Sequence, residues 1–136
     1  KDRELCPPPV LVLDKIEEIF NPRLLEKYML ELQHMNGLHR KGCAANIKMN
    51  DASKLEPTFN VNLNEAMLYH GAKSKDLDLI SEAGFDPRRG GQSAGRLFGF
   101  GTYFADAFSK ADLYAGPRPF KRVEGSICVL VAKVAL

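Results

Sequence analysis

The chain has 136 residues, of which 45% are hydrophobic and 26% are charged, as is typical of one globular domain with an ordinary apolar core. The formal net charge is only +2, and the cationic residues are scattered along the chain. The sequence therefore does not indicate a nucleic-acid-binding surface, which usually needs clustered lysine and arginine.

The first segment predicts an extended lead-in followed by a strand. Three consecutive prolines at residues 7–9 fix an extended backbone, so we expect a linker over residues 1–9 and one domain over 10–136. Residues 10–13 favour a strand, whereas residues 14–20 are ambiguous between strand and helix. We favour a strand for both.

The next segment predicts an amphipathic helix that packs on a sheet. Asn21 can cap the helix, Pro22 suits its first turn, and Gly37 is expected to end it. Between them the apolar residues recur at helical spacing: Leu24, Leu25, Tyr28, Met29, Leu32 and Met35. The asparagine-rich stretch 38–63 is expected to be rich in loops.

The middle of the chain predicts a short strand and a second helix. Residues 67–70 favour a strand that ends at Gly71. Ser74 can cap a helix over about 75–83, and Gly84 can end it. The residues expected to face inward are Leu77, Ile80 and Ala83.

The last segments predict a loop, two strands and a helix. Residues 86–99 read as a glycine-rich basic loop and 101–105 as a short strand. Asp106 is expected to cap a helix over 107–115, which Gly116-Pro117 ends. A polar loop then leads to residues 126–136, which are almost wholly apolar and are expected to form a central strand. This order indicates an α/β or α+β protein.

The three cysteines indicate reduced thiols and therefore an intracellular protein, cytoplasmic or nuclear. Their number is odd, and the spacings of Cys6, Cys43 and Cys128 fit no zinc pattern, so we expect no metal. Cys128 lies in an apolar run and is expected to be a small core residue. No apolar run approaches the length of a membrane span, so no membrane partner is expected.

Three features could belong to a small-molecule site, and each has a plainer alternative. The loop sequence GRLFGFG matches neither a dinucleotide fingerprint nor a phosphate loop, so it is either a surface loop or a lid over a ligand. His70-Gly71 at a strand end is either structural or ligand-binding. Tyr103, Phe104 and Tyr114 are either core aromatics or, through the two tyrosines, a clamp for a flat ring.

Two stretches together resemble the catalytic domain of the poly(ADP-ribose) polymerase family. Residues 64–71 (NEAMLYHG) are similar to the family pattern NE-x-x-L-[FYW]-H-G, and residues 98–110 (FGFGTYFADAFSK) are similar to FG-x-G-x-YFA-[DE]-x-x-SKS. Residues 10–36 resemble the start of family members that lack the helical regulatory subdomain, so the likeness runs nearly from end to end. It implies an α+β ADP-ribosyltransferase-like fold: a mixed sheet, flanking helices and a central NAD cleft.

The resemblance also implies a role for each matching residue. His70, Tyr103 and Lys110 would be catalytic, and the backbone of Gly71 would hold the nicotinamide carboxamide. Tyr114 would stack on the nicotinamide ring with Tyr103 closing its other side. Residues 86–98 would border the adenosine and diphosphate. The residues implied to contact NAD are His70, Gly71, Ala72, Arg88, Tyr103, Phe104, Ala105, Lys110, Ala111 and Tyr114.

The implied activity is transfer of ADP-ribose from NAD to a macromolecule, a protein or a nucleic acid, with release of nicotinamide. The chain departs from the family pattern in three places. It ends at Leu136, before the strand expected to carry the family's glutamate. Ala111 and Ala72 stand where hydroxyl residues are usual. A catalytically inactive module that binds NAD or a partner protein therefore stays the alternative.

Overall fold

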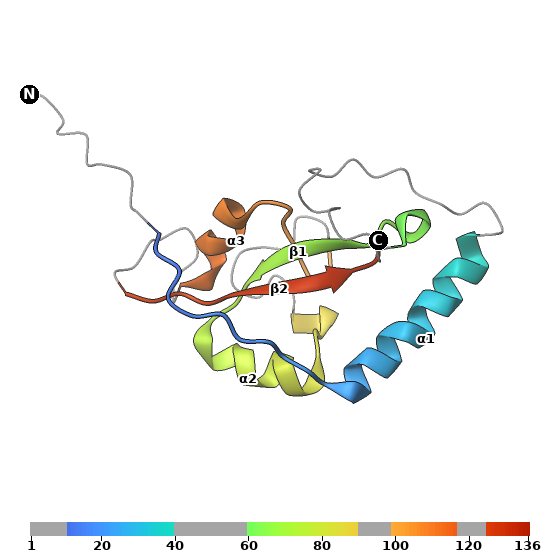
Figure 1. Ribbon diagram of the computed structural model, residues 1–136, viewed down its shortest axis with the longest axis horizontal. Helices are drawn as coiled ribbons and strands as arrows, with labels where there is room; N and C mark the ends of the chain where they lie inside the picture. Colours follow the sequence, from blue (N-terminus) through green and yellow to red (C-terminus); the bar gives the residue numbers. More distant parts are fainter. Residues whose placement is uncertain (1–10, 40–59, 90–98, 117–124) are drawn as a thin grey trace, which may run out of the picture.

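The computed structural model describes residues 11–39, 60–89, 99–116 and 125–136 (Figure 1). Three helices and two strands in these ranges make an α+β arrangement. The elements in chain order are α1 (Pro22–His39), the 3-10 turn η2 (Val61–Leu63), β1 (Ala66–Gly71), α2 (Ser74–Ala83), the 3-10 turn η3 (Pro87–Arg89), α3 (Phe108–Ala115) and β2 (Val129–Val134).

Four sequence-based predictions fall wholly or mostly outside the described residues. They are the linker over 1–9, most of the loop over 38–63, the glycine-rich part of the loop over 86–99, and the polar loop that follows Gly116.

β1 is the inner strand of the described sheet. It pairs antiparallel with β2 along its whole length, from Ala66 opposite Val134 to Gly71 opposite Val129. On its other edge Tyr69 exchanges two backbone hydrogen bonds with Ala105, of 2.8 and 2.9 Å. The predicted strand over 101–105 is therefore reduced, in the described residues, to a single bridge.

The prediction of a central strand over 126–136 is wrong in the described part of the structure. Pairing is confined to Val129–Val134, and β1 is the one described strand beside it. Val131 is 53% exposed, which a strand covered on both faces would not allow. Cys128 precedes the paired stretch and is exposed, so its predicted place in the core is also wrong.

α3 packs directly on the end of β1, and small residues make this possible. A side chain at Gly71 would collide with the carbonyl oxygen of Ala111 and would lie 3.0 Å from the amide nitrogen of Ala115. The ring of Tyr69 meets Phe108 edge-on, with centroids 5.8 Å apart. The buried apolar residues of the described chain are mostly alanines: Leu63, Ala66, Leu68, Ala72, Ala105, Ala111 and Ala115.

α1 forms as predicted but packs elsewhere than expected. Asn21 caps it, since its Oδ1 accepts a hydrogen bond from the amide of Leu24. The helix continues through Gly37 to His39, because an interior glycine costs a helix only about 1 kcal/mol. Instead of lying on the sheet, α1 meets η2 and the end of α2, where Asn21 donates to the carbonyl of Ser81 at 2.9 Å.

Two predicted helix starts and one predicted strand need correction. α2 and α3 begin after Lys73 and Ala107, and neither Ser74 nor Asp106 is the cap. Residues 11–20 form neither strand nor helix, and their apolar side chains are exposed, as at Ile16 (79%). β-forming composition alone cannot make a strand without a partner to complete its hydrogen bonds. Of the residues predicted to face inward on α2, Leu77 and Ile80 are half-buried and Ala83 is exposed.

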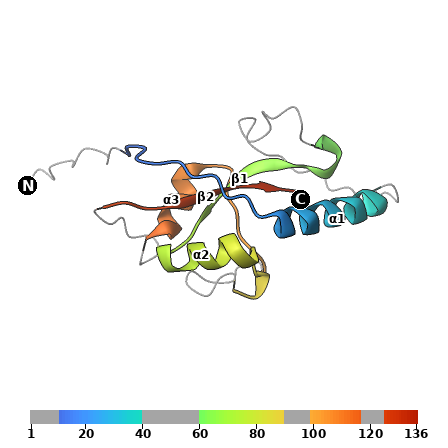
Figure 2. The same ribbon diagram turned by 60° about the horizontal axis from the view of Figure 1, so that its bottom comes forward.

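α2 lies below the paired strands in both views (Figures 1 and 2), and Gly84 ends it as predicted. Gly84 has φ +82°, and a Cβ there would lie 3.0 Å from Leu24 Cδ2 of α1. The turn that follows α2 therefore needs a glycine for two reasons, backbone conformation and space.

Gly84→Ala is expected to destabilise the protein by about 1–2 kcal/mol, because a side chain strains this left-handed backbone. Gly37→Ala is the matched control, since nothing lies within 4 Å of its Cβ and it lies inside α1. The control is expected to stabilise by about 0.5–1 kcal/mol. Chemical denaturation measures both, and equal effects would contradict this account of Gly84.

Candidate functional site

The last two residues of β1 present their backbone groups in opposite directions. Tyr69 uses both its N–H and its C=O on Ala105, so its pair with Val131 is of the non-hydrogen-bonded kind. Hydrogen-bonded and non-hydrogen-bonded pairs alternate along an antiparallel pair of strands. His70 therefore directs its backbone groups to Leu130 of β2, and Gly71 directs its backbone groups to the side of Ala105. The bridge has ended there, which leaves one donor and one acceptor at Gly71 facing the same region.

A hydrogen bond to the backbone holds the ring of His70 in one orientation. Its Nδ1 lies 2.8 Å from the carbonyl oxygen of Tyr103, which can only accept, so Nδ1–H donates. The neutral ring then has Nε2 as a hydrogen-bond acceptor. The imidazole packs against Phe85 and Phe104, with centroids 5.0 and 5.5 Å away, and these two rings also meet each other edge-on at 5.0 Å.

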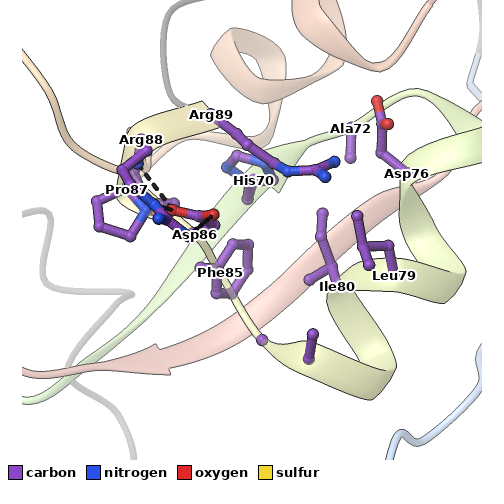
Figure 3. A pocket seen from close by; sticks show the side chains of 13 residues that line it. His70, Ala72, Asp76, Leu79, Ile80, Phe85, Asp86, Pro87, Arg88 and Arg89 are labelled. Carbon is purple, nitrogen blue, oxygen red and sulfur yellow. Dashed lines mark hydrogen bonds and ion pairs between the residues drawn. The ribbon is translucent and has the colours of Figure 1, made fainter.

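A cavity of about 620 Å³ opens beside His70, between the end of β1, α2 and η3 (Figure 3). This volume lies within the range of small-molecule and cofactor sites. One wall comes from α2 and is apolar apart from Asp76, and the other comes from Asp86 and η3 and carries most of the charged side chains (Figure 3). The lining residues are His70, Ala72, Asp76, Leu79, Ile80, Ala83, Gly84, Phe85, Asp86, Pro87, Arg88, Arg89 and Thr102.

The two arginines on the η3 wall of the cavity differ in their interactions. Arg88 donates from Nε and Nη2 to the two oxygens of Asp86, both at 2.9 Å, and its amide donates to the same carboxylate. The Arg88 side-chain and backbone hydrogen bonds hold the pKa of Asp86 down at about 2. Arg89 instead extends over the cavity towards Ala72 (Figure 3). Its guanidinium is therefore placed to meet an anionic group of a ligand.

The structure brings most of the predicted site residues to this end of the sheet. His70, Ala72 and Arg88 line the cavity, and Phe104 packs on His70. Gly71 and Ala111 touch across the β1–α3 contact. Tyr114, one turn after Ala111, and Lys110 lie on α3, where the Lys110 side chain is exposed.

Tyr103 contributes through its backbone as well as its ring. Its carbonyl holds His70, and its hydroxyl donates to the carbonyl of Gly99 at 2.8 Å. The ring is 38% exposed. That the Tyr103 and Tyr114 rings face each other across one slot stays a prediction.

Two cavity residues, Asp76 and Phe85, are missed by sequence reasoning, and Arg89 is expected there only as part of the loop 86–98. Phe85 supplies an aromatic wall, Asp76 projects from α2, and Arg89 reaches across the opening. Asp76, Leu79 and Ile80 do share helical spacing, which was a usable signal. Arg88 and Arg89 are adjacent in sequence, so which of them points into the cavity depends on the 3-10 turn of η3.

No group of three or more histidine, cysteine, aspartate or glutamate side chains in the described ranges of the chain could hold a metal ion. Within the same ranges, no helix is both long and apolar enough to cross a membrane.

Comparison with known proteins shows the family to which the chain belongs. The family model described as the poly(ADP-ribose) polymerase catalytic domain matches residues 13–136. The chain therefore belongs to the poly(ADP-ribose) polymerase catalytic-domain family, whose fold is that of the ADP-ribosyltransferases.

A relative is the poly [ADP-ribose] polymerase tankyrase of Caenorhabditis elegans, which is 39% identical over 71 residues. The similarity covers 51% of this chain and 3% of the length of that protein. It supports a function of the ADP-ribosyltransferase type in general terms.

Arg88→Gln is expected to return the pKa of Asp86 towards its ordinary value of 3.8, because it removes the side-chain donors that lower it. The lowered pKa means that the pair contributes stability above the unfolded value and loses it as pH falls towards 2. A carboxyl ¹³C NMR titration measures the midpoint. Arg89→Gln is the control and should shift it less, so equal shifts would refute the assignment.

Proposed function

We propose that this chain forms the NAD site of an ADP-ribosyltransferase. The reaction cleaves the bond between nicotinamide and ribose and moves ADP-ribose to a macromolecular acceptor, a protein in the first place and a nucleic acid as the other candidate. One observation carries the proposal: β1 ends in a histidine and a glycine at the point where α3, the cavity and two backbone hydrogen-bonding groups meet.

The nicotinamide end of NAD suits the Gly71 side of this strand end. A primary carboxamide offers one N–H donor and one C=O acceptor side by side, which complements the amide and carbonyl of Gly71. Tyr114 on α3 and Tyr103 before the bridge are proposed to stack on the two faces of the flat ring. The exposed Lys110, one turn before Tyr114, is proposed to lie near the nicotinamide ribose.

The adenosine and diphosphate end suits the cavity. The free Nε2 of His70 can accept a hydrogen bond from a ribose hydroxyl. Phe85 and the α2 side chains supply an apolar wall for a base. Arg89 is proposed to pair with a phosphate, and Arg88 to keep Asp86 ionised and in place at the rim.

The proposed chemistry needs charge stabilisation more than a nucleophile. Breaking the nicotinamide–ribose bond gives a transition state in which positive charge spreads over the ribose, as in glycoside cleavage. Interactions made on both sides of that bond can hold NAD in a strained pose that approaches this state. Gly71 and Tyr114 would bind the nicotinamide leaving group, while His70 would bind the ADP-ribose part of NAD.

The second candidate function is a module that binds NAD or a partner protein without catalysis. Ala72 and Ala111 favour it, because both are buried and neither offers the hydroxyl that resemblance to the family leads one to expect. Each missing hydrogen bond costs about 1 kcal/mol, roughly fivefold in affinity. Such losses weaken binding without abolishing it.

Labelled NAD tests the proposal and separates the two candidates. The natural full-length protein that contains this chain is expected to transfer label to acceptor protein, and Tyr114→Ala should raise the Kd for NAD about fivefold or more by removing one stacking face. Tyr114→Phe keeps the ring and serves as the control. Binding without transfer would favour the non-catalytic module, and unchanged affinity in Tyr114→Ala would refute the clamp.

Ala111→Ser is expected to strengthen binding of nicotinamide and of benzamide-type analogues by roughly fivefold, since a hydroxyl there could bond the carboxamide. Isothermal titration measures the gain. Ala115→Ser, one turn further along the same buried face of α3, is the control and should give no gain. Equal affinity for wild type and Ala111→Ser would place the carboxamide elsewhere.

A further inference from the structure

A buried carboxylate stands immediately before β1 and joins three other parts of the chain. Glu65 is 4% exposed. The hydroxyl of Tyr28 in α1 donates to its Oε1 at 2.7 Å, and the amide of Asn60 donates to its Oε2. The ammonium of Lys133 in β2 lies 3.2 Å from Oε1. Both oxygens are thus engaged, by a helix, by the segment before η2 and by the partner strand.

The carboxylate keeps its charge in this setting. Burial by itself would raise the pKa of Glu65, but the hydrogen bonds from Tyr28 and Asn60 together with Lys133 lower it. Burial, and next the same carboxylate, raise the pKa of Tyr28, so the phenol stays protonated and donates. The group is therefore an ionised pair plus a neutral donor, and removing Lys133 would leave the buried carboxylate of Glu65 without its opposite charge.

The two strands do not specify their own register strongly. β1 reads AMLYHG and β2 reads VLVAKV, and apolar residues occupy both alternating sets of positions in each strand. A slip by one residue moves every side chain to the other face, and such a slip is opposed only where the two faces differ. The two faces are similarly apolar in sequence, so alternation by itself leaves the register ambiguous, although Ala66 and Leu68 are buried whereas Val131 is 53% exposed.

Lys133 removes this ambiguity. It is the charged residue of β2, and it pairs with Met67, which makes it the diagonal neighbour of Glu65 on the same face. A slip by one residue would turn Lys133 to the opposite face and separate the two charges. Setting register is the best-supported use of a buried polar group, whose net contribution to stability is often small.

We propose that Glu65, together with Lys133 and Tyr28, sets the register of β1 against β2 and is thereby a positioning residue for His70 and Gly71. A slip of β1 that also breaks its bridge to Ala105 would turn the His70 ring away from the Tyr103 carbonyl and would direct the backbone groups of Gly71 into the sheet. The consequence for NAD rests on the proposed function, whereas the setting of register does not.

An apolar replacement of the whole group tests this. The variant Tyr28→Phe/Glu65→Leu/Lys133→Met removes the charges together, so it is expected to melt near or above the wild-type temperature. In wild type, Tyr69 and Val131 form a non-hydrogen-bonded pair and should show one strong Hα–Hα contact by NMR. The variant should show a second set of cross-strand contacts, and its Kd for NAD should rise at least about tenfold.

Removing an exposed ion pair by equivalent substitutions gives the matched control. Lys15 and Glu17 lie 2.7 Å apart with side chains 69% and 70% exposed, and Lys15→Met/Glu17→Leu should leave the register contacts and NAD affinity unchanged. A single wild-type set of contacts in the triple variant would overturn the proposal and would make Glu65 a stabilising residue alone.

Two further outcomes are decisive. If the triple variant does not fold, Glu65→Gln, which removes the charge at constant size, should show the second set of contacts, and a single set there overturns the proposal. If wild type shows one register but binds no NAD, the proposed function fails while the register inference stands. Register and binding are therefore tested separately.

Discussion

The two hydrogen bonds between Tyr69 and Ala105 orient the rest of this site. Because they use both backbone groups of Tyr69 on the edge away from β2, they fix which residues of β1 bond to the sheet and which do not. His70 is thereby tied to β2 by its backbone, and Gly71 is turned towards the open side. The bridge is a single pair, but the alternation of a strand transmits its effect to both residues.

Close packing of small residues between α3 and β1 shapes the side of Gly71 that faces away from β2. α3 lies so near β1 that only glycine fits at position 71, and alanines fill the contact around it. The polar groups of Gly71 that face this region are its backbone amide and carbonyl. The charged residues sit across β1 at the cavity rim, where Asp86 already holds Arg88 and Arg89 is directed over the opening.

Sequence patterns anticipated the elements of this fold better than their connections. The strand ending at Gly71, the helix ending at Gly84 and the helix starting at Asn21 follow from local rules of capping and backbone freedom, and the structure has all three. The strand expected over 10–20, the central place of the last strand and the core position of Cys128 each depended on a neighbour that local pattern does not reveal. For the site, resemblance to the family supplied His70, Gly71 and Ala72 and the loop that contains Arg89, whereas Phe85 and Asp76 needed the fold.

By itself, the sequence determined where the chain can bend, cap or pack closely, because those properties belong to single residues and their immediate neighbours. It also determined the family, through two motifs whose residues are specific enough to be matched without a structure. The tertiary structure decided which strand is inner, which arginine enters the cavity and what Glu65 contacts. These depend on hydrogen bonds and ion pairs between residues far apart in the chain, such as Tyr28, Glu65 and Lys133, and no local pattern encodes such distances.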